Sequence, residues 1–379
     1  MPPFVIKEHV HIDIFMVLFY SECFIITLIE NYQFPEQSFN RRIVLMINNL
    51  LVAACVKGTE ERLKAAGIPY VIEENDAYRN YMGIWNRSKR KEELLKQVRP
   101  ALARFAALEP YLHETSGEPL CIRFNGPERD LDKDSFAEVL LERKDLNWAI
   151  GVSIKNDARV LTDMRIADRS MGSYMDHETG AFNEIEDFGD KIFGVPCSNE
   201  YFDDVNAILQ NIQAYDRDAW RKQLDNEDFI YDNVVTPILK AFAHEIPRIC
   251  EGHPEAPMHF FDYFYGKYDY YFLNPIDKLR VTRMGAVNVR GGLGRIPGTN
   301  NHFTNVVEKP TQLLDVRFAT GPNGEISKDT IQMSFDGGWV MCFTIRVANT
   351  QKHGRSFNLG VYMPVTPFGS FRDQVKWDD

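Results

Sequence analysis

Two segments in the first third of the chain carry apolar residues at helical spacing. Between Arg41 and Ala66, and again between Lys91 and Leu108, these residues fall three and four positions apart and share one face. Gly67-Ile68-Pro69 should end the first predicted helix, and Pro110 should close the second. On the second helix we expect this face to hold Leu94, Leu95, Val98, Leu102, Phe105 and Leu108. Both helices are expected to be scaffold rather than chemistry.

A β-hairpin is predicted next. Residues 136–143 and 147–155 are rich in apolar and branched side chains, and the short polar connection Lys144-Asp145-Leu146 joins them. In an antiparallel pair the start of the first strand lies beside the end of the second. Side chains alternate along a strand, so Ser153 and Lys155 point one way while their branched neighbours point into an apolar layer.

The remaining pattern predicts helices first and strands afterwards. Residues 201–215 and 234–243 have helical spacing, Pro247 is expected to stop the second helix, and residues 251–257 read as a linker. Beyond the linker, strands are predicted at 268–273, 279–289, 312–319, 330–335, 339–347 and 357–363. The expected fold class is therefore α/β (α+β), with N-terminal helices and a β-rich C-terminal region.

Composition narrows the class of protein. A chain of 379 residues with 44% hydrophobic content can bury a sizeable core in one large domain or two. Its 6 cysteines form no Cys-x-x-Cys pair, so neither a zinc site nor a disulfide framework is expected. Residues 14–29 are apolar but shorter than the roughly 20 residues that span a bilayer. We expect no membrane insertion; a buried helix, a dimer contact or an extension stay open for this segment.

Charge is unevenly distributed along the chain. A net charge of -11 does not by itself suggest nucleic-acid binding. From Lys278 to Lys309, however, the segment contains several basic residues and one acidic residue, Glu308. Within it, Arg290-Gly291-Gly292-Leu293-Gly294-Arg295 is the favoured DNA contact, because glycines allow close approach and arginine can bond two acceptors of guanine. The alternative is a flexible hairpin without a reading role.

Lys267 and the tyrosines that follow it form a second candidate DNA-binding patch. The alternative is that the aromatic residues between positions 260 and 272 belong to the core. The glycine-rich segment lacks the Gly-Lys-Ser/Thr ending of a phosphate-binding loop, which argues against nucleotide binding.

The predicted hairpin carries a candidate catalytic pair. Glu138 lies at the start of the first strand and Lys155 at the end of the second. A carboxylate can hold a divalent cation, and the cation and a lysine together can activate water and stabilise charge on a phosphate. Asp134, in the preceding turn, is an alternative metal ligand. The simpler alternative is that Lys155 is a solvated lysine at the end of a strand and has no catalytic role.

Several of these segments together resemble the HaeIII family of type II restriction endonucleases. The matching pieces are Trp148 to Lys155, Asp187-Phe188-Gly189-Asp190-Lys191 and Gly194-Val195-Pro196-Cys197-Ser198, with others at 73–79, 85–86, 107–110, 266–271 and 338–349. The resemblance implies a PD-(D/E)XK-like nuclease core and Mg²⁺- or Mn²⁺-dependent cleavage of double-stranded DNA at a short palindrome, GGCC in that family. It also implies a cytoplasmic enzyme that works with a DNA methyltransferase, and the palindrome favours a homodimer.

The same resemblance suggests roles for individual residues. Glu138 stands where the family carries an acidic residue, and Ser153 where many PD-(D/E)XK nucleases place a second acidic ligand. Because a hydroxyl is a weaker ligand for a hard cation, a further acid is expected, with Asp157, Asp163 and Asp168 as the candidates. Arg165 could contact a phosphate or pair with a neighbouring aspartate.

Departures from the family pattern leave a second function open. Ala149 replaces an acidic residue, and Asn156-Asp157-Ala158-Arg159 replaces a His/Asn-rich stretch. The alternative is a catalytically impaired, sequence-specific DNA-binding protein that keeps the nuclease fold. In both cases we expect an apolar extension over residues 1–40, a helical scaffold with the nuclease core over 41–250, and a β-rich DNA-recognition region over 258–379.

Overall fold

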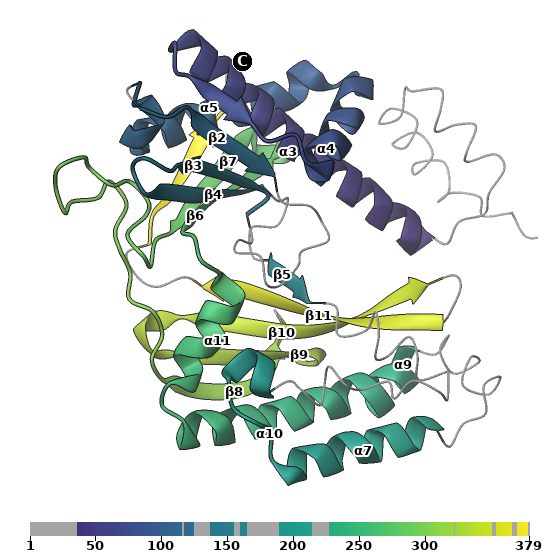
Figure 1. Cartoon of the computed structure of the whole chain (residues 1–379). Helices are drawn as coiled ribbons and strands as arrows, with labels where there is room; N and C mark the ends of the chain where they lie inside the picture. Colours follow the sequence, from purple (N-terminus) through teal and green to yellow (C-terminus); the bar gives the residue numbers. More distant parts are fainter. Residues whose placement is uncertain are drawn as a thin grey trace, which may run out of the picture. The chain divides into compact units, whose positions relative to one another are not determined.

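The computed structural model describes residues 36–115, 117–124, 137–154, 160–164, 189–213, 227–321, 323–350, 354–365 and 370–377 (Figure 1). Its helices are α3 (Glu36–Ala65), α4 (Asp76–Arg87), α5 (Lys91–Leu108), α7 (Asn199–Gln213), α9 (Glu227–Ile230), α10 (Thr236–Gly252) and α11 (Ala256–Tyr265). Short helical turns are η1 (Pro110–His113), η2 (Gly189–Phe193), η3 (Tyr231–Val235), η4 (Asp277–Leu279) and η5 (Asp336–Gly338). Residues 48–379 make up one unit, and the first 47 residues belong to another.

Two sheets contain the strands of the described chain. The larger follows the order β1 (Tyr70–Ile72), β2 (Leu120–Phe124), β3 (Val139–Arg143), β4 (Trp148–Ile154), β6 (Tyr270–Ile276), β7 (Val281–Val287) and β12 (Arg372–Lys376). The smaller follows β5 (Val160–Met164), β11 (Gly354–Val365), β10 (Val340–Thr350), β9 (Ile326–Phe335) and β8 (Leu313–Thr320). The expectation of a mixed α+β fold is confirmed.

In the larger sheet, antiparallel neighbours alternate with two parallel pairs. Strands β2, β3 and β4 form an antiparallel meander, and β6 then pairs with β4 in parallel. Strands β7 and β12 continue the sheet antiparallel from β6. Helix α5 packs against β6, β7 and β12, and all six residues of its predicted apolar face are buried. That prediction, including the bounds of the helix, is confirmed.

Both sheets cross the predicted boundary near residue 250. Strands β6, β7 and β12 complete the sheet that begins with β1 to β4, while β5 pairs with β11 in the other. The division into a core and a recognition region stays a prediction. Residues 14–29 lie outside the described chain, and none of the helices that the structure describes has the length and hydrophobicity to span a bilayer. The cysteines in the described part of the chain are free thiols.

Helix α10 corrects one prediction. Pro247 was expected to stop this helix, but α10 continues to Gly252. Ile246 and Ile249, on either side of the proline, are fully buried. Burying side chains of this size contributes about 1.5–3 kcal/mol each, enough to offset the roughly 3 kcal/mol cost of an interior proline. The predicted linker at 251–257 is correspondingly short, since α11 already begins at Ala256.

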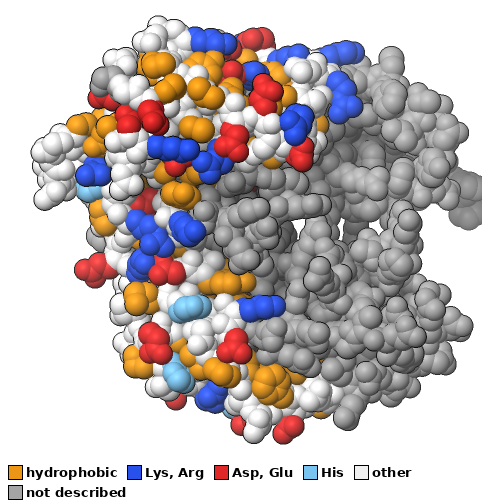
Figure 2. Space-filling view, in the orientation of Figure 1, with side chains coloured by type: hydrophobic (Ala, Val, Ile, Leu, Met, Phe, Trp, Pro, Cys, Tyr) orange, Lys and Arg blue, Asp and Glu red, His pale blue; other side chains and the backbone are white. Residues whose placement is uncertain are grey.

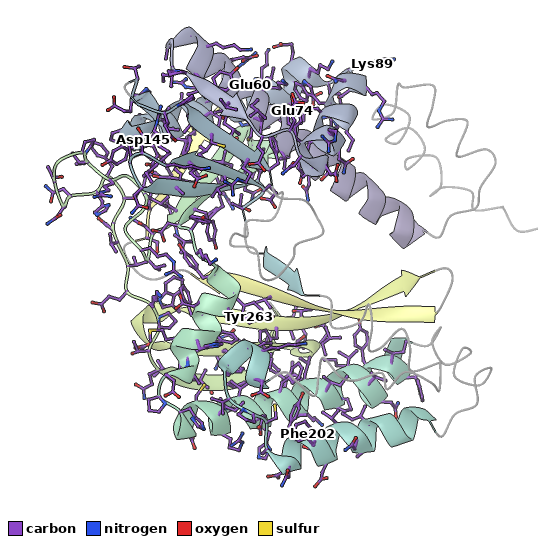
Figure 3. The ribbon with its side chains drawn as sticks, viewed as in Figure 1. Glu60, Glu74, Lys89, Asp145, Phe202 and Tyr263 are labelled. Carbon is purple, nitrogen blue, oxygen red and sulfur yellow. The ribbon has the colours of Figure 1, made fainter. Side chains whose placement is uncertain are left out.

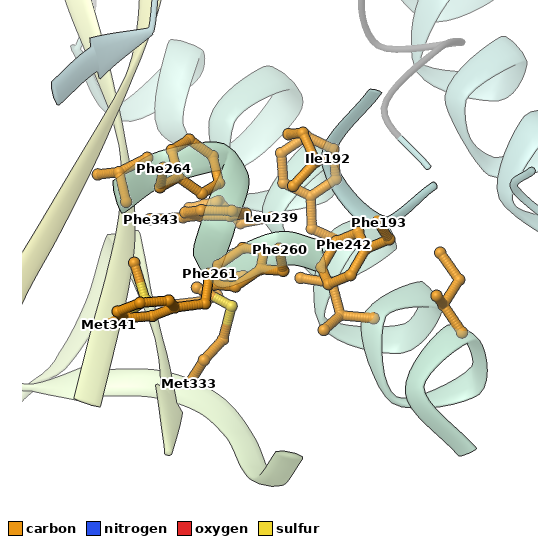
Figure 4. Close-up of a cluster of buried hydrophobic side chains, with 14 of the residues drawn as sticks. Ile192, Phe193, Leu239, Phe242, Phe260, Phe261, Phe264, Met333, Met341 and Phe343 are labelled. Atoms are coloured by element: carbon orange, nitrogen blue, oxygen red, sulfur yellow. The ribbon is translucent and has the colours of Figure 1, made fainter. Parts of the chain in front are cut away.

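An aromatic core joins α10 and α11 to the smaller sheet (Figure 4). Phe260 of α11 is fully buried, and its ring centroid lies 4.9 Å from that of Phe193 and 5.5 Å from that of Phe335. Phe343 of β10 packs on the same ring at 5.7 Å. The prediction that aromatics after position 260 belong to the core is confirmed for this helix.

Replacing Phe260 with alanine should destabilise the protein by about 3–5 kcal/mol, because the cavity left among rings cannot collapse fully. Urea denaturation followed by tryptophan fluorescence would measure the change. Met258→Ala is the matched control, since Met258 lies on the same helix and is 43% exposed. Equal losses in the two variants would contradict this account of the core.

Candidate functional site

The predicted β-hairpin is confirmed as β3 and β4. Register pairs Val139 with Val152 and Arg143 with Trp148. Glu138 precedes the first of these pairs and Ser153 follows it, so the two residues stand level at the open end of the hairpin. Residues 144–147 form the turn, in which Asn147 adopts a left-handed backbone with φ 47°. Asparagine tolerates this conformation better than most residues.

The turn end of the hairpin is fixed by a buried arginine. Arg143 is fully buried and donates hydrogen bonds to the carbonyl oxygens of Tyr111 at 2.7 Å, Glu118 at 2.9 Å and Glu114 at 2.5 Å. Asp145, labelled in Figure 3, accepts a hydrogen bond from the Glu118 amide at 3.2 Å. These contacts bind the turn end of the hairpin to the segment after α5. Because the turn end is fixed, the open end of the hairpin has a defined position as well.

At the open end, the Glu138 carboxylate is oriented by the backbone of β4. The Ile154 amide donates a hydrogen bond to Glu138 Oε2 at 3.0 Å. Burial first, and the negative charge of Glu138 second, raise the pKa of the Cys55 thiol of α3. Glu138 therefore lies near α3, with one carboxylate oxygen bound to the last residue of β4.

Ser153 lies beside Glu138 but is not open to solvent. Its exposed fraction is 7%, and its neighbour on the parallel strand β6 is Phe272. Strand β4 is covered on both faces, because Ile150, Val152 and Ile154 are buried as well. The register therefore places Ser153 beside Glu138 at the open end of the hairpin.

Several predicted site residues lie outside the described residues. These are Asp134, Lys155, Asp157, Arg165 and Asp168. Asp163 is in β5, where its backbone pairs with Gly360 of β11. Their roles stay predictions, although Lys155 directly follows the residue whose amide binds Glu138.

Glu138 fits a metal site only as one ligand. Ca²⁺ or Mg²⁺ takes six or more oxygen ligands, several of them from carboxylates, water or substrate. Within the described ranges, no group of three or more His, Cys, Asp or Glu residues is placed to hold a metal ion. The described residues therefore supply part of a ligand set and no complete site.

The glycine-rich segment after β7 wraps around a buried carboxylate. Asp269 is 1% exposed and accepts hydrogen bonds from the amides of Val289 at 2.8 Å and Gly292 at 2.7 Å, and from that of Arg290. The Tyr265 hydroxyl donates to the same carboxylate at 2.6 Å. Sequence reasoning did not single out Asp269; the only signal was its position inside a family-like segment.

A second buried carboxylate holds the end of this segment. Glu109 is fully buried, and its Oε1 accepts hydrogen bonds from the Tyr271 hydroxyl and the Gly294 amide, both at 2.6 Å. Its Oε2 is buried and has no partner among the described residues. Burial raises the pKa of Glu109 to about 8, against the lowering effect of these two hydrogen bonds. The carboxyl group is therefore mostly protonated at neutral pH.

The two arginines of the segment differ in their surroundings. Arg290 donates to Asp262 Oδ1 at 2.9 Å and to the Gly266 carbonyl at 2.8 Å. Lys309 binds the same Asp262 carboxylate at 2.7 Å. Arg295 is exposed, and so is Lys267 in the turn after α11. Figure 2 shows basic groups interspersed with acidic ones on the visible face rather than one continuous basic stripe.

A mixed fold with an oriented carboxylate at the mouth of a buried hairpin is compatible with a phosphodiester-cleaving enzyme. Residues 51–361 match the model of the HaeIII restriction endonuclease family, so the chain belongs to that family of site-specific endonucleases. It is similar to the Type II restriction enzyme HaeIII of Haemophilus aegyptius, with 26% identity over 287 residues, 74% of this chain and 81% of the relative. No solved structure matches the chain.

The buried carboxyl of Glu109 should make stability fall as pH rises. Its pKa is raised in the folded state, so the folded protein binds the extra proton between the ordinary value of 4.5 and about 8. Stability is lost through this window because the folded state must give up that proton or bury a charge. We expect a loss of roughly 2 kcal/mol between pH 6 and pH 8.

Urea denaturation at the two pH values would measure this loss. Glu109→Gln, which stays neutral, should flatten the dependence, whereas Glu118→Gln on an exposed carboxylate should leave it unchanged. An unaltered pH dependence in Glu109→Gln would contradict the assignment of the proton to this group.

Proposed function

We propose that this protein hydrolyses double-stranded DNA at a short palindrome, with Glu138, Ser153 and Lys155 at the cleavage site and Mg²⁺ or Mn²⁺ as cofactor. Family membership supports DNA cleavage. The single observation that carries the choice of residues is the hydrogen bond from the Ile154 amide to Glu138 Oε2 at 3.0 Å. It fixes the Glu138 carboxylate against Ile154, the residue that directly precedes Lys155 in the sequence.

The proposed roles follow from the chemistry of each group. Glu138, with Asp134 as a second acid, would hold the cation, and the cation would supply Lewis-acid polarisation of the phosphate. Lys155 would offset negative charge on the phosphate as water adds to phosphorus and the P–O bond to the leaving sugar oxygen breaks. Ser153 would hydrogen-bond at the same end of β4. Arg165, Lys267 and Arg295 are the proposed DNA contacts, and Arg290, predicted from the sequence as a further contact, is instead proposed to hold the segment that carries Arg295.

The wider setting of the enzyme is also proposed. Strands β2, β3, β4 and β6 with α5 would form a PD-(D/E)XK-like core, supported by the antiparallel meander and the parallel fourth strand. GGCC is the proposed target, from the family resemblance. A two-fold symmetric site favours a homodimer, which analytical ultracentrifugation would detect. A cognate DNA methyltransferase would protect host DNA in the cytoplasm.

Lys155→Ala should reduce plasmid cleavage in Mg²⁺ on the order of 10²-fold or more, because one charge-stabilising group at the reacting phosphate is lost. Glu138→Gln should have a comparable effect that excess Mg²⁺ partly relieves. Lys144→Ala is the matched control, because Lys144 is an exposed lysine in the turn of the same hairpin. Gel analysis of supercoiled, nicked and linear plasmid gives the rates.

The outcomes separate the alternatives. Full activity in Lys155→Ala would remove this lysine from the mechanism. A wild-type protein that binds one sequence tightly but leaves the plasmid intact at every Mg²⁺ and Mn²⁺ concentration would contradict the proposed hydrolysis. Sequencing the ends of a digested mixed DNA library would identify the target and test GGCC directly.

A further inference from the structure

We propose that residues 294–303 form the sequence-reading hairpin, and that Arg295, Asn300 and Asn301 contact base edges in the major groove. This inference rests on the proposed function, in that the ligand is duplex DNA. It assigns reading to the exposed tip of the segment after β7 and gives Arg290 a structural role at its base.

The tip is an ordered hairpin and not an irregular loop. Arg295 and His302 form an antiparallel bridge. The Phe303 amide donates to the Gly294 carbonyl at 2.7 Å, and the Ile296 amide to the Asn301 carbonyl at 3.0 Å. Two chain segments joined by one bridge are no wider than a two-stranded β-ribbon, which the major groove, about 12 Å wide, admits.

The base of the hairpin is held by buried polar side chains. Asn288, 1% exposed, donates to the carbonyl oxygens of Leu293 at 3.2 Å and Thr304 at 3.0 Å. Glu109 accepts the Gly294 amide, and Asp269 accepts three amides further back. Buried hydrogen-bonded groups of this kind fix a loop before its ligand arrives, which lowers the entropic cost of binding.

The exposed side chains at the tip are of the types that can form paired hydrogen bonds with base edges. Arginine forms two hydrogen bonds with guanine, and asparagine forms two with adenine. Arg295, Asn300 and Asn301 are exposed, and their side chains form no hydrogen bond or ion pair with the residues that the structure describes. Phe303, 51% exposed on the same hairpin, offers an apolar contact. Residues 289–307 contain no Asp or Glu that would repel DNA.

Arg290 contrasts with Arg295. Its guanidinium is bound to Asp262 and to the Gly266 carbonyl, and it lies 6.0 Å from the centroid of the Tyr265 ring. If Arg290 turned to contact a base, Asp262 would lose one of its two basic partners and keep only Lys309 of the two. We therefore assign Arg290 to positioning the hairpin and Arg295 to contact with DNA.

A binding selection tests the proposal without requiring cleavage. The full-length protein is incubated with a randomised duplex library in Ca²⁺ in place of Mg²⁺, and the bound fragments are sequenced. Arg295→Ala and the double variant Asn300→Ala/Asn301→Ala should each weaken binding of the wild-type target by about 10- to 100-fold and relax the selected sequence. Arg62→Ala, an exposed arginine of α3, should match the wild type.

Arg295→Lys separates base reading from phosphate contact. Lysine keeps the charge but not the paired geometry, so it should bind with relaxed sequence preference. Full rescue of sequence preference by lysine, or unchanged selection in both alanine variants, would overturn the proposal. Unchanged thermal unfolding would verify that the variants are folded, as expected for exposed side chains.

The outcomes for reading and hydrolysis are independent. A wild-type protein that selects a sequence but never cuts would contradict the proposed hydrolysis and leave reading intact. One that cuts at a defined site, while the tip variants select and cut the same site equally well, would overturn the reading hairpin alone. Absence of any selected sequence in the wild type would overturn it as well.

Discussion

A strand covered on both faces determines where polar chemistry can occur in this protein. Strand β4 lies between β3 and β6; Ile150, Val152 and Ile154 are buried on one of its faces, and Gly151 and Ser153 on the other. A polar side chain in such a strand is costly unless it is hydrogen-bonded, so reactive groups gather where the strand leaves the sheet. There Glu138 binds the Ile154 amide, and Ser153 lies level with it. The candidate cleavage site therefore lies at the end of β4, because polar side chains are costly along its buried length.

The same strand connects the candidate cleavage site to the glycine-rich segment. The Gly151 amide donates to the Asp269 carbonyl at 2.9 Å, and the Asp269 side chain holds the amides of Val289 and Gly292. Gly151 is two residues from Ser153, a distance of about 7 Å along a strand. One short stretch of β4 therefore supports both the open end of the β3–β4 hairpin and the base of the proposed reading hairpin. A link of this length would couple the proposed cleavage site to the proposed reading site.

Local pattern was sufficient for some elements and insufficient for others. The period of α5 gave its bounds because this helix buries one regular face. The run of apolar and branched side chains indicated β3 and β4, which are buried on both faces. Helix α11 was missed because aromatic residues cover most of its circumference and leave no clear period. The exchange of strands between sheets and the partners of Glu109 depend on residues far apart in the chain, such as Tyr271 and Gly294, which no local pattern connects. Site residues outside the described chain, Lys155 among them, are supported by sequence alone.

An acidic protein can bind DNA when hydrogen bonds to base edges, rather than a large excess of positive charge, supply much of its discrimination. The net charge is -11, and Asp262 is bound by two cations, Arg290 and Lys309, so little free positive charge remains there. Affinity that comes mainly from phosphate contacts is insensitive to sequence and falls steeply with salt. A rigid hairpin with one arginine and two asparagines at its tip would instead obtain much of its discrimination from hydrogen bonds to bases, which salt screens less. Acidity elsewhere on the surface then disfavours binding to any sequence that the hairpin does not fit.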